Sequence, residues 1–592
     1  MNFLDFEPLQ GALTGIIFGL GVLLVAYIPK YKWLAASLIC IGITPLALMP
    51  FWFSYGDLGI SDWDYYFSMH STLQKSISEF HQFPLWNPYV CGGTSALGDP
   101  EFPVFSPLFL FEIAFGTPAG FVLSIYTSVA IGALGMLHFA RKIGIGPVGA
   151  LMASLPMAFG SVNLLEIVEG HPNILSAMYI PWVWYCWYSA YVGTVKQKKY
   201  FIIATAFLLA LMFFQGGIYL LMYMAGAFIA MLFFVKNPKR AIYITLLAGI
   251  LALGLASAKL IPVFYWLQQF QDAAYASSAY TLSSLHEILL GRHLHGGEDI
   301  IPNQGGGWHE YGAYIGPLVL LMALWGYIVR RKERLTRALL LSAVLAILVS
   351  AMGPYLKPMF DQMPFFPRSN VSRVILFAII PLSLLAGCGV DALAKKKKYI
   401  RGAAILIVTL AAIDLMSLAY QLAAQAFVLP HTVDAIPEAP HPIAYSPFDY
   451  KFRHNGVDYT RAYEATNKGY GNMAYCSVLG PDPAVRIITD EGDNNIISFS
   501  HNENASFELH AWTPNTIITT VKSVDASSAV LNANYAKGWE VNGKPAKEIM
   551  NRVGTDIPAG TTKLTFTYKP PGMMLGAVIS SISIIVAILL LF

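Results

Sequence analysis

The chain has 592 residues, of which 56% are hydrophobic and only 12% are charged, whereas about 25% of the residues of an ordinary soluble protein are charged. With a mean hydropathy of +0.53, this composition excludes a soluble globular protein and predicts an integral membrane protein. The net charge of +3 reflects no large basic excess, so no nucleic-acid partner is predicted.

Apolar segments follow one another along most of the chain. A helix needs about 20 apolar residues to cross a bilayer, and we count thirteen candidates. Gln215, Gly216 and Gly217 separate two of them, which we interpret as a tight hairpin, with one long kinked helix as the alternative. The candidates cover residues 9–28, 33–53, 119–140, 146–162, 176–194, 200–215, 217–235, 241–263, 312–329, 338–353, 374–391, 402–421 and 573–592.

Lys and Arg are unevenly distributed between the connecting loops. The alternate loops that begin with 29–32 hold 20 of them, whereas the opposite loops hold five. Because basic loops stay in the cytoplasm, we predict a multi-pass protein of the cell membrane (inner or plasma membrane). Its N-terminus is predicted to be extracytoplasmic and its C-terminus cytoplasmic. The long outer loops are then 54–118, 163–175, 264–311 and 354–373.

The character of the sequence changes after the helical part, 1–424. In 425–571 short alternating stretches replace the long apolar runs, and Asn542-Gly543 is a typical hairpin turn. This predicts an extracytoplasmic β-sandwich domain, followed by a C-terminal transmembrane helix at 572–592. The domain carries 12 basic and 15 acidic residues, a mixture typical of a solvated surface.

Five cysteines are scattered along the chain without a Cys-x-x-Cys pair. Their spacing therefore predicts neither a disulfide framework nor a zinc site.

Acidic residues are frequent in the outer loops, where few cations are available to pair with them. The first candidates are Asp62 and Asp64, directly after the second apolar segment. In a helix these side chains lie about 200° apart, so only one could face a cleft, whereas an extended turn would let both bind one metal ion. A short acidic pair is also common in loops without a function. Carboxylates of this kind either bind a divalent cation or activate a hydroxyl group.

The loop that follows is rich in proline, glycine and aromatic residues, from Phe83 to Pro107. Such a composition predicts a rigid, irregular backbone of the kind that carries functional residues. An aromatic belt at the membrane surface is the alternative interpretation.

Short motifs recur along nearly the whole chain. Together they resemble the YfhO-type bacterial membrane proteins, within the GT-C superfamily of glycosyltransferases that use polyprenyl-phosphate sugars. The resemblance implies a GT-C-like polytopic α-helical fold of about thirteen transmembrane helices. The motifs are Asp62 followed by Phe83-Pro84-Leu85-Trp86-Asn87-Pro88-Tyr89 and Gly92-Gly93, then Gly170-His171, Glu310–Gly316, Pro367–Arg373, Tyr535–Trp539, Asn542–Lys544, Pro558–Gly560 and Tyr568–Pro571.

The resemblance also implies a mechanism. An acid in the first large outer loop acts as general base or positions the acceptor, and Asp62 matches that position, with Asp64 in reserve. The leaving phosphate needs cations, for which Arg368 and Arg373 are the candidates because guanidinium pairs well with phosphate. The alternatives for both are snorkelling at the membrane interface or pairing with Asp361.

Further candidates for substrate binding follow from the same motifs. His171 could bind phosphate or orient Asp62, although a single histidine is often structural. Glu310 lies in a matched motif. Asp99 and Glu101 lie where the family pattern has Asn-Pro, so the extra acid there indicates a different acceptor or a metal ligand.

The most metal-like cluster is the loop with His293, His295 and Glu298, close in sequence to His309 and Glu310. Two histidines two positions apart can share a metal ion on an extended segment, but the spacing is not that of a known zinc site, and a substrate-gating loop is the alternative. A divalent cation, Mg²⁺ or Mn²⁺, is the one cofactor considered, and the resemblance leaves it open.

The resemblance implies transfer of a sugar from a polyprenyl-phosphate donor to an acceptor in the cell envelope, which could be a glycan, a lipid or a protein. The sequence has no nucleotide-binding motif, and a lipid-linked donor needs none. A non-catalytic scaffold subunit and a transporter of lipid-linked sugar are the alternatives. Transport has little support, because Lys259 and Asp414 are the only clear ionisable residues within the predicted spans, apart from residues at their ends.

Overall fold

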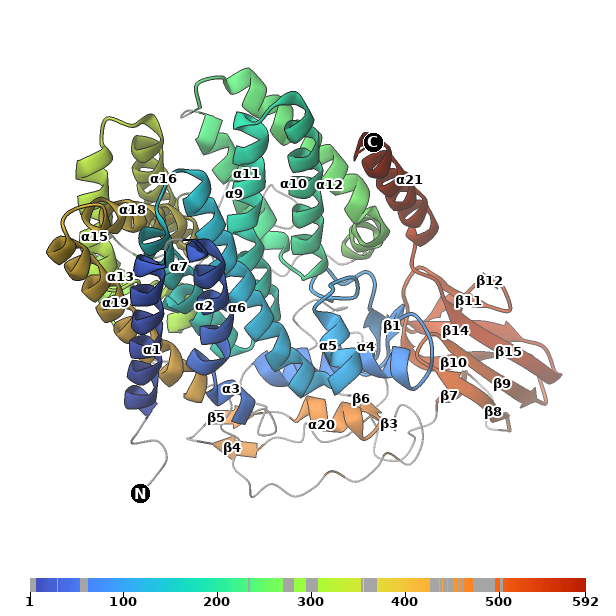
Figure 1. The fold of residues 1–592 in the computed structure, drawn as a ribbon. Helices are drawn as coiled ribbons and strands as arrows, with labels where there is room; N and C mark the ends of the chain where they lie inside the picture. Colours follow the sequence, from blue (N-terminus) through green and yellow to red (C-terminus); the bar gives the residue numbers. More distant parts are fainter. Residues whose placement is uncertain are drawn as a thin grey trace.

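The computed structural model shows a layer of long helices with a separate group of strands at one end (Figure 1). It describes residues 7–28, 30–53, 62–232, 235–269, 280, 282–293, 307–352, 355, 370–425, 436, 439, 444–445, 452–454, 457–459, 461–471, 496–500 and 504–591.

The helical layer is that of a multi-pass membrane protein. Within the described part of the chain, nine helices are long and apolar enough to cross a membrane. The principal helices are α1 (Glu7–Tyr27), α2 (Lys32–Ala47), α6 (Thr117–Lys142), α7 (Pro147–Phe159), α8 (Ser161–Glu169), α9 (Ile180–Val192), α10 (Val195–Phe214), α11 (Ile218–Leu232), α12 (Pro238–Leu267), α15 (Pro317–Arg330), α16 (Arg334–Ala351), α18 (Leu376–Ala394), α19 (Lys398–Gln425) and α21 (Met573–Leu591).

The thirteen predicted segments all contain helix, but the count of thirteen spans is supported only in part. Three of the segments form shorter apolar helices, Lys32–Ala47, Ile218–Ile229 and Pro317–Arg330. In the predicted segment 176–194 the α-helix α9 has only 13 residues, because a 3₁₀ helix, η2 (Pro172–Tyr179), precedes it. The length of a helix decides whether it spans the bilayer. The length of α9 is limited because its α-helical part begins only after η2.

The prediction of two helices around residue 216 is confirmed. Helix α10 ends at Phe214 and α11 begins at Ile218. Gly216 between them has φ of 88°, in the left-handed region, where glycine is favoured and where α-helices commonly end.

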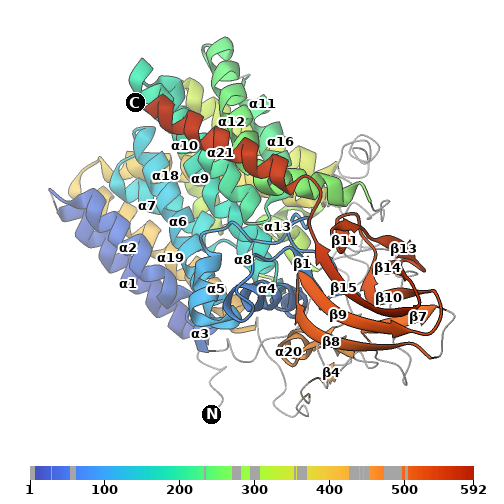
Figure 2. The same ribbon diagram turned by 90° about the vertical axis from the view of Figure 1, so that its right-hand side faces the viewer.

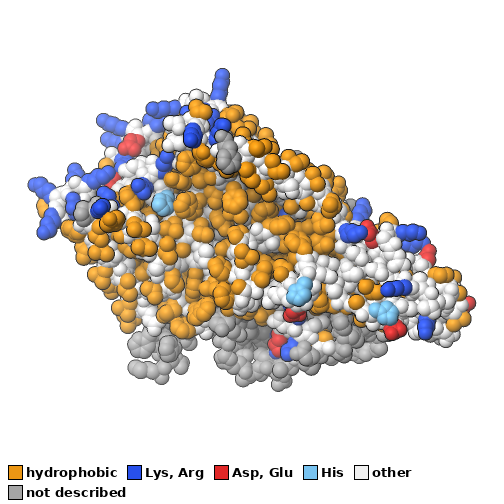
Figure 3. Space-filling view, turned by 45° about the vertical axis from the view of Figure 1, so that its right-hand side comes forward, with side chains coloured by type: hydrophobic (Ala, Val, Ile, Leu, Met, Phe, Trp, Pro, Cys, Tyr) orange, Lys and Arg blue, Asp and Glu red, His pale blue; other side chains and the backbone are white. Residues whose placement is uncertain are grey.

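The two ends of the helical layer differ. The N-terminus and the strands lie toward one side, and the C-terminus lies on the other (Figure 1). Figure 3 shows Lys and Arg side chains gathered along the upper edge of a broad apolar surface. Exposed basic residues at helix ends include Lys32, Arg331 and Lys395. Such an arrangement is typical of a membrane protein with one basic face.

Nine strands before the last helix form two antiparallel sheets with one shared hydrophobic core, which we call the C-terminal sandwich (Figure 2). The region predicted to be β-rich therefore contains sheets. The hairpin turn at Asn542-Gly543 is present, because both residues have positive φ and Val541 pairs with Lys544. The sheet orders are β13-β14-β10-β7 and β12-β11-β15-β9-β8, with bounds β7 Ile497–Ser500, β8 Ser506–Thr513, β9 Thr516–Ser523, β10 Ser527–Asn534, β11 Trp539–Val541, β12 Lys544–Pro545, β13 Lys547–Ile549, β14 Arg552–Ile557 and β15 Gly560–Tyr568.

The proline-rich loop is part of this sandwich. Trp86, on the short strand β1 (Trp86–Asn87, paired with β2, Thr94–Ser95), is only 1% exposed and belongs to the sandwich core, where its ring contacts Trp539 and Tyr568. Asn515 of the sandwich accepts hydrogen bonds from the backbone of Leu85 and Trp86, at 3.1 Å each. The loop thus docks the sandwich onto the helical layer.

One cysteine takes part in a disulfide, which the spacing of the cysteines did not indicate. Cys91 is disulfide-bonded, whereas Cys40, Cys186 and Cys388 have free thiols, and Cys476 lies outside the described residues. Sequence spacing gave no signal because disulfide partners need to be close only in space.

A further short helix, α20 (Ala462–Asn467), packs against α4 (Asp62–Ser78), which lies in the segment 54–118 between two predicted spans. Two small pairs of strands accompany it. β3 (Ala444–Tyr445) pairs in parallel with β6 (Tyr470–Gly471), and β4 (Phe452–His454) pairs antiparallel with β5 (Val457–Tyr459). Part of the chain that follows the helical layer therefore returns to the helix that carries Asp62.

Candidate active site

Two segments far apart in sequence meet at the start of α4. Asp62 is the first residue of α4, and α8 ends at Glu169 beside it, followed by Gly170 and His171. Gly170 has φ of 105°, and a Cβ atom there would lie 2.4 Å from the backbone nitrogen of Trp63. Only glycine therefore permits this close approach, which turns the chain so that His171 reaches Asp62.

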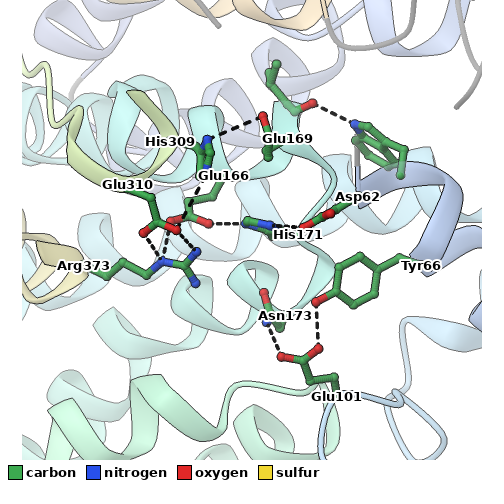
Figure 4. A network of polar contacts seen from close by, with 12 residues as sticks. Asp62, Tyr66, Glu101, Glu166, Glu169, His171, Asn173, His309, Glu310 and Arg373 are labelled. Carbon is green, nitrogen blue, oxygen red and sulfur yellow. Dashed lines mark hydrogen bonds and ion pairs between the residues drawn. The ribbon is translucent and has the colours of Figure 1, made fainter. Parts of the chain in front are cut away.

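His171 lies between two carboxylates (Figure 4). Its Nε2 is 2.7 Å from Oδ2 of Asp62, and its Nδ1 is 2.5 Å from Oε2 of Glu166. An ionised carboxylate only accepts hydrogen bonds. The three groups therefore share two protons, and the simplest distribution is an imidazolium between two carboxylates.

Glu166 is held in turn by Arg373, from the 3₁₀ helix η5 (Val371–Ile375). Nε of Arg373 lies 3.0 Å from Oε1 of Glu166. The same guanidinium donates to both oxygens of Glu310 on α14 (Trp308–Tyr311), through Nε at 2.9 Å and Nη2 at 2.8 Å. Bidentate pairing of this kind fixes orientation as well as charge.

His309, on α14 beside Glu310, completes the network. Its Nδ1 lies 3.5 Å from Oε2 of Glu169 and its Nε2 lies 3.6 Å from Oε1 of Glu310. Its ring centroid is 5.6 Å from that of His171. Acidic and basic groups therefore alternate along the charge network, which we define as Asp62, His171, Glu166, Arg373, Glu310, His309 and Glu169.

The network is buried except at Asp62. The side chain of Asp62 is 47% exposed, whereas those of His171 and Glu166 are 10% and 3% exposed. The other members lie between 8% and 18%. The carboxylate of Asp62 is thus the part of the network that a substrate can reach.

Protonation follows from these contacts. Burial acts to lower the pKa of His171, but the hydrogen bonds to Asp62 and Glu166 raise it to about 10. Burial acts to raise the pKa of Asp62, but His171, together with His309 and Arg373, holds it below its ordinary value. At neutral pH Asp62 is a carboxylate and His171 is an imidazolium.

The other end of the network behaves similarly. Burial would raise the pKa of Glu310, yet Arg373 and His309 hold it well below the ordinary value. Burial would lower the pKa of His309, but Glu310 and Glu169 raise it. The carboxylate of Glu310 is therefore ionised at neutral pH, and His309 holds its second proton more tightly than an ordinary histidine does.

A second polar cluster lies beside the first, around Glu101 (Figure 4). Glu101 accepts hydrogen bonds from Tyr66 at 2.7 Å, from Asn173 at 3.2 Å and from Tyr219. Its backbone nitrogen donates to Asp99 at 2.8 Å. Tyr66 lies one helical turn after Asp62 on α4, so both clusters are joined through this helix.

Asp64 lies on another side of α4 and contacts α20 instead. Its carboxylate oxygens accept hydrogen bonds from the backbone nitrogens of Ala462 at 2.8 Å and Tyr463 at 2.9 Å. The structure therefore places Asp62 and Asp64 in different environments, as expected for residues two apart in a helix.

The remaining residues predicted to bind substrate fall into three groups by their location. Glu310 and Arg373 join Asp62 and His171 in the charge network. Asp99 and Glu101 lie in the adjacent cluster. Arg368 lies outside the described residues.

Of the three residues of the predicted metal site, only His293 lies among the described residues, so the prediction stays untested. His293 stacks on Trp308 with ring centroids 3.4 Å apart, and its Nε2 lies 3.2 Å from Glu287. His295 and Glu298 lie outside the described residues. Among the residues that the structure describes, no group of three or more His, Cys, Asp or Glu side chains could hold a metal ion.

The sequence motifs do not include Glu166, which occupies the centre of the network. It lies one turn before the end of α8, in a buried and mostly apolar stretch. An acid in such a position is costly unless it is paired and is often functional, so this placement is the signal that could have identified it. His309 was noted only as a neighbour of a possible metal cluster, and its contact with Glu169 could not be read from spacing.

No family model matches the sequence, and a search of curated proteins finds no match. Solved structures with a similar fold include two of one protein and one of another. They are ArnT from Cupriavidus metallidurans in the apo state (12% identity, 64% of this chain and 75% of that chain, TM-score 0.41), the same protein bound to undecaprenyl phosphate (11%, 75% and 86%, TM-score 0.42), and the arabinofuranosyltransferase AftD from Mycobacteria (15%, 68% and 28%, TM-score 0.42).

Proposed function

We propose that this chain is a membrane glycosyltransferase that moves a sugar from a polyprenyl-phosphate donor to an acceptor of the cell envelope, on the extracytoplasmic face. The observation that carries this proposal is the half-exposed carboxylate of Asp62, at the open end of an otherwise buried charge network and beside membrane-spanning helices. The motifs that resemble YfhO-type proteins support the choice of donor, because Asp62 and His171 both belong to them.

In the proposed reaction a nucleophile of the acceptor attacks the anomeric carbon of the donor sugar. The new bond forms to that carbon, the bond from the carbon to the phosphate oxygen breaks, and polyprenyl phosphate leaves with the electron pair. A hydroxyl acceptor loses its proton to Asp62. Positioned general bases contribute roughly 10²–10⁴ in rate.

The charge network supports this role for Asp62. Because His171 lowers the pKa of Asp62, the carboxylate is ionised and able to accept a hydrogen bond from the acceptor at neutral pH. A lowered pKa also makes Asp62 a weak base. Its contribution is therefore greatest when proton transfer is late, after the bond to the leaving phosphate has begun to break.

The proposed orientation places the site outside. The basic edge of the helical layer lies on the side of the C-terminus (Figures 1 and 3), which supports a cytoplasmic C-terminus. The disulfide of Cys91, in the first outer loop, supports the same orientation, because disulfides persist mainly outside the cytoplasm. The N-terminus and the C-terminal sandwich are then extracytoplasmic.

Release of polyprenyl phosphate from a panel of polyprenyl-phosphate sugars tests the proposal. The purified protein in nanodiscs is compared with Asp62→Asn, which keeps the shape of the side chain but cannot accept the proton as a carboxylate does. We expect the variant to lose about 10²–10⁴ in kcat. Parallel reactions with EDTA test the divalent cation, Mg²⁺ or Mn²⁺, which we retain only as a proposal.

Asp556→Asn is the matched control. Asp556 is an exposed residue of the sandwich. Its side chain is 63% exposed and contacts Lys547 and Ser528. The activity of Asp556→Asn should therefore equal that of the wild type. If no donor is turned over, or if Asp62→Asn is as active as the wild type, the proposed function is wrong. The scaffold and transporter alternatives would then be preferred.

A further inference from the structure

We propose that Glu166 is a positioning residue, which holds His171 with Nε2 toward Asp62 and so orients the carboxylate that receives the acceptor proton. This inference rests on the proposed function. Nothing in the motif resemblance includes Glu166, and its role follows from where the fold places it.

The first argument is the geometry of His171. A histidine ring can turn about two side-chain bonds, and a hydrogen bond at one nitrogen fixes both the ring and its protonation. Glu166 supplies that hydrogen bond at Nδ1, at 2.5 Å, which leaves Nε2 as a donor toward Asp62 at 2.7 Å. Without Glu166, the ring could donate to Asp62 through one nitrogen while the other remained unprotonated.

The second argument is that Glu166 is itself held in place. Its side chain is 3% exposed, and Arg373 contacts its other oxygen at 3.0 Å. Arg373 is fixed by two further contacts with Glu310. Each oxygen of Glu166 therefore has a different partner, and a carboxylate bound at both oxygens is a rigid support.

The third argument comes from every charged or titratable group that faces His171. Asp62 and Tyr66 approach from α4, Glu166 from α8 and His309 from α14, with Arg373 behind Glu166. Only the two carboxylates favour the imidazolium form. Removal of one leaves Asp62 alone to oppose burial and the positive charges of His309 and Arg373.

The sign of the expected pH effect follows. His171 keeps its second proton up to about pH 10, so the imidazolium beside Asp62 is present below that pH and is lost as the pH rises through it. In Glu166→Gln the pKa of His171 falls. The alkaline limit of kcat/KM should therefore move to lower pH, by about one to three pH units, and kcat at neutral pH should fall.

Glu112→Gln is the matched control, because Glu112 also forms a buried pair with a histidine. Its Oε1 lies 2.8 Å from Nδ1 of His70, and the two side chains are 3% and 1% exposed. The substitution makes the same chemical change in an equally buried glutamate–histidine pair outside the charge network. We expect Glu112→Gln to change stability but to leave the pH profile of kcat/KM as in the wild type.

A readout that does not depend on turnover separates this inference from the proposed function. NMR of the histidine-labelled protein in nanodiscs follows the titration of His171, whose signal is assigned by its loss in His171→Gln. We expect the pKa of His171 to fall in Glu166→Gln and to be unchanged in Glu112→Gln. If this shift is observed but no donor is turned over, the conclusion that Glu166 stabilises protonated His171 stands. The proposed glycosyltransferase function is then wrong.

Glu166→Asp tests the inference even if Glu166→Gln does not fold. Aspartate keeps the charge but is shorter, so the pKa of His171 should stay well above that of an ordinary histidine while kcat falls. The inference is wrong if either variant leaves both kcat and the titration of His171 unchanged. It is also wrong if Glu112→Gln shifts the alkaline limit as much as Glu166→Gln.

Discussion

Arg373 is the residue on which the buried carboxylates of the site depend. It contacts both Glu166 and Glu310, and its guanidinium is charged at any physiological pH. From the sequence it was a candidate to bind the donor phosphate. In the structure both of its carboxylate partners are internal, so its charge serves the network.

Replacement of Arg373 by Gln should therefore be strongly destabilising. The change leaves two buried carboxylates without their cation, and loss of one partner from a buried ion pair costs about 3–5 kcal/mol. The free energy of unfolding, measured by chemical denaturation in detergent, should fall by about that amount. The free energy of unfolding of Arg373→Lys should lie between those of the wild type and Arg373→Gln, because Lys keeps the charge but cannot make the bidentate contact.

Arg331→Gln provides the control for that experiment. Arg331 is exposed at the end of α15, and a substitution at an exposed position changes the free energy of unfolding by about 0.5 kcal/mol or less. If Arg373→Gln is no less stable than Arg331→Gln, the two glutamates do not depend on Arg373 and the description of the network is wrong.

At the scale of elements, α4 has two polar faces with different tasks. Asp62 and Tyr66, one turn apart, face the two polar clusters of the site. A second stripe of polar side chains at helical spacing holds α20. Its members are Asp64, which caps the N-terminus of α20, Ser68 and Ser71, which contact Thr466 and Asn467, and Lys75, which donates to the last backbone carbonyls of α20.

The charges of that stripe match the dipole of α20, because an acid lies at its N-terminus and a cation at its C-terminus. Asp64→Ala should therefore loosen α20. Loss of an N-terminal cap costs about 0.5–2 kcal/mol, so hydrogen exchange at the backbone amides of Ala462 and Tyr463 should be faster by roughly 2-fold to 30-fold.

Asp62→Asn serves as the comparison for Asp64→Ala, because Asp62 lies on the same helix but its described partner is His171. The rates of hydrogen exchange in α20 should be the same in Asp62→Asn as in the wild type. Equal rates in Asp64→Ala and the wild type would show that the contact with α20 is unimportant, and a loss of turnover in Asp64→Ala with α20 intact would restore Asp64 as a catalytic candidate.

For the whole molecule, the decisive contact is the one between the proline-rich loop that contains Trp86 and the C-terminal sandwich. Trp86 is inserted into the sandwich core, and Gly93 allows it, since a Cβ atom at Gly93 would lie 2.4 Å from the Trp86 ring. Asn534 of the sandwich donates to the backbone of Cys91 and Gly93. The loop therefore belongs to both the helical layer and the sandwich, and it leads directly to Asp99 and Glu101.

Trp86→Ala should separate the sandwich from the helical layer. Truncation of a buried large aromatic side chain costs about 3–5 kcal/mol, so limited proteolysis should release the sandwich from the variant faster than from the wild type. Phe83→Ala in the same loop is the control, because Phe83 is 45% exposed and should have a small effect. Equal rates of release for the two variants would contradict the docking role of Trp86.

The sequence by itself determined the class of the protein and most of its elements. Long apolar runs predicted the helices, and alternation with the Asn542-Gly543 turn predicted strands, because hydropathy and turn chemistry are local properties. Local sequence also singled out Asp62 and His171, since both lie in short motifs. It could not reveal how many helices are long enough to span the membrane, because that depends on where each helix begins and ends.

Only the tertiary structure decided which polar groups meet. His171 contacts an acid 109 residues away, and Asp64 contacts backbone 398 residues away, distances at which sequence spacing carries no information. The same holds for Trp86, whose place in the sandwich core no periodicity indicates. The physical reason is that a buried charge or ring is stable only with its partner, and the partner is chosen by the packing of the whole chain.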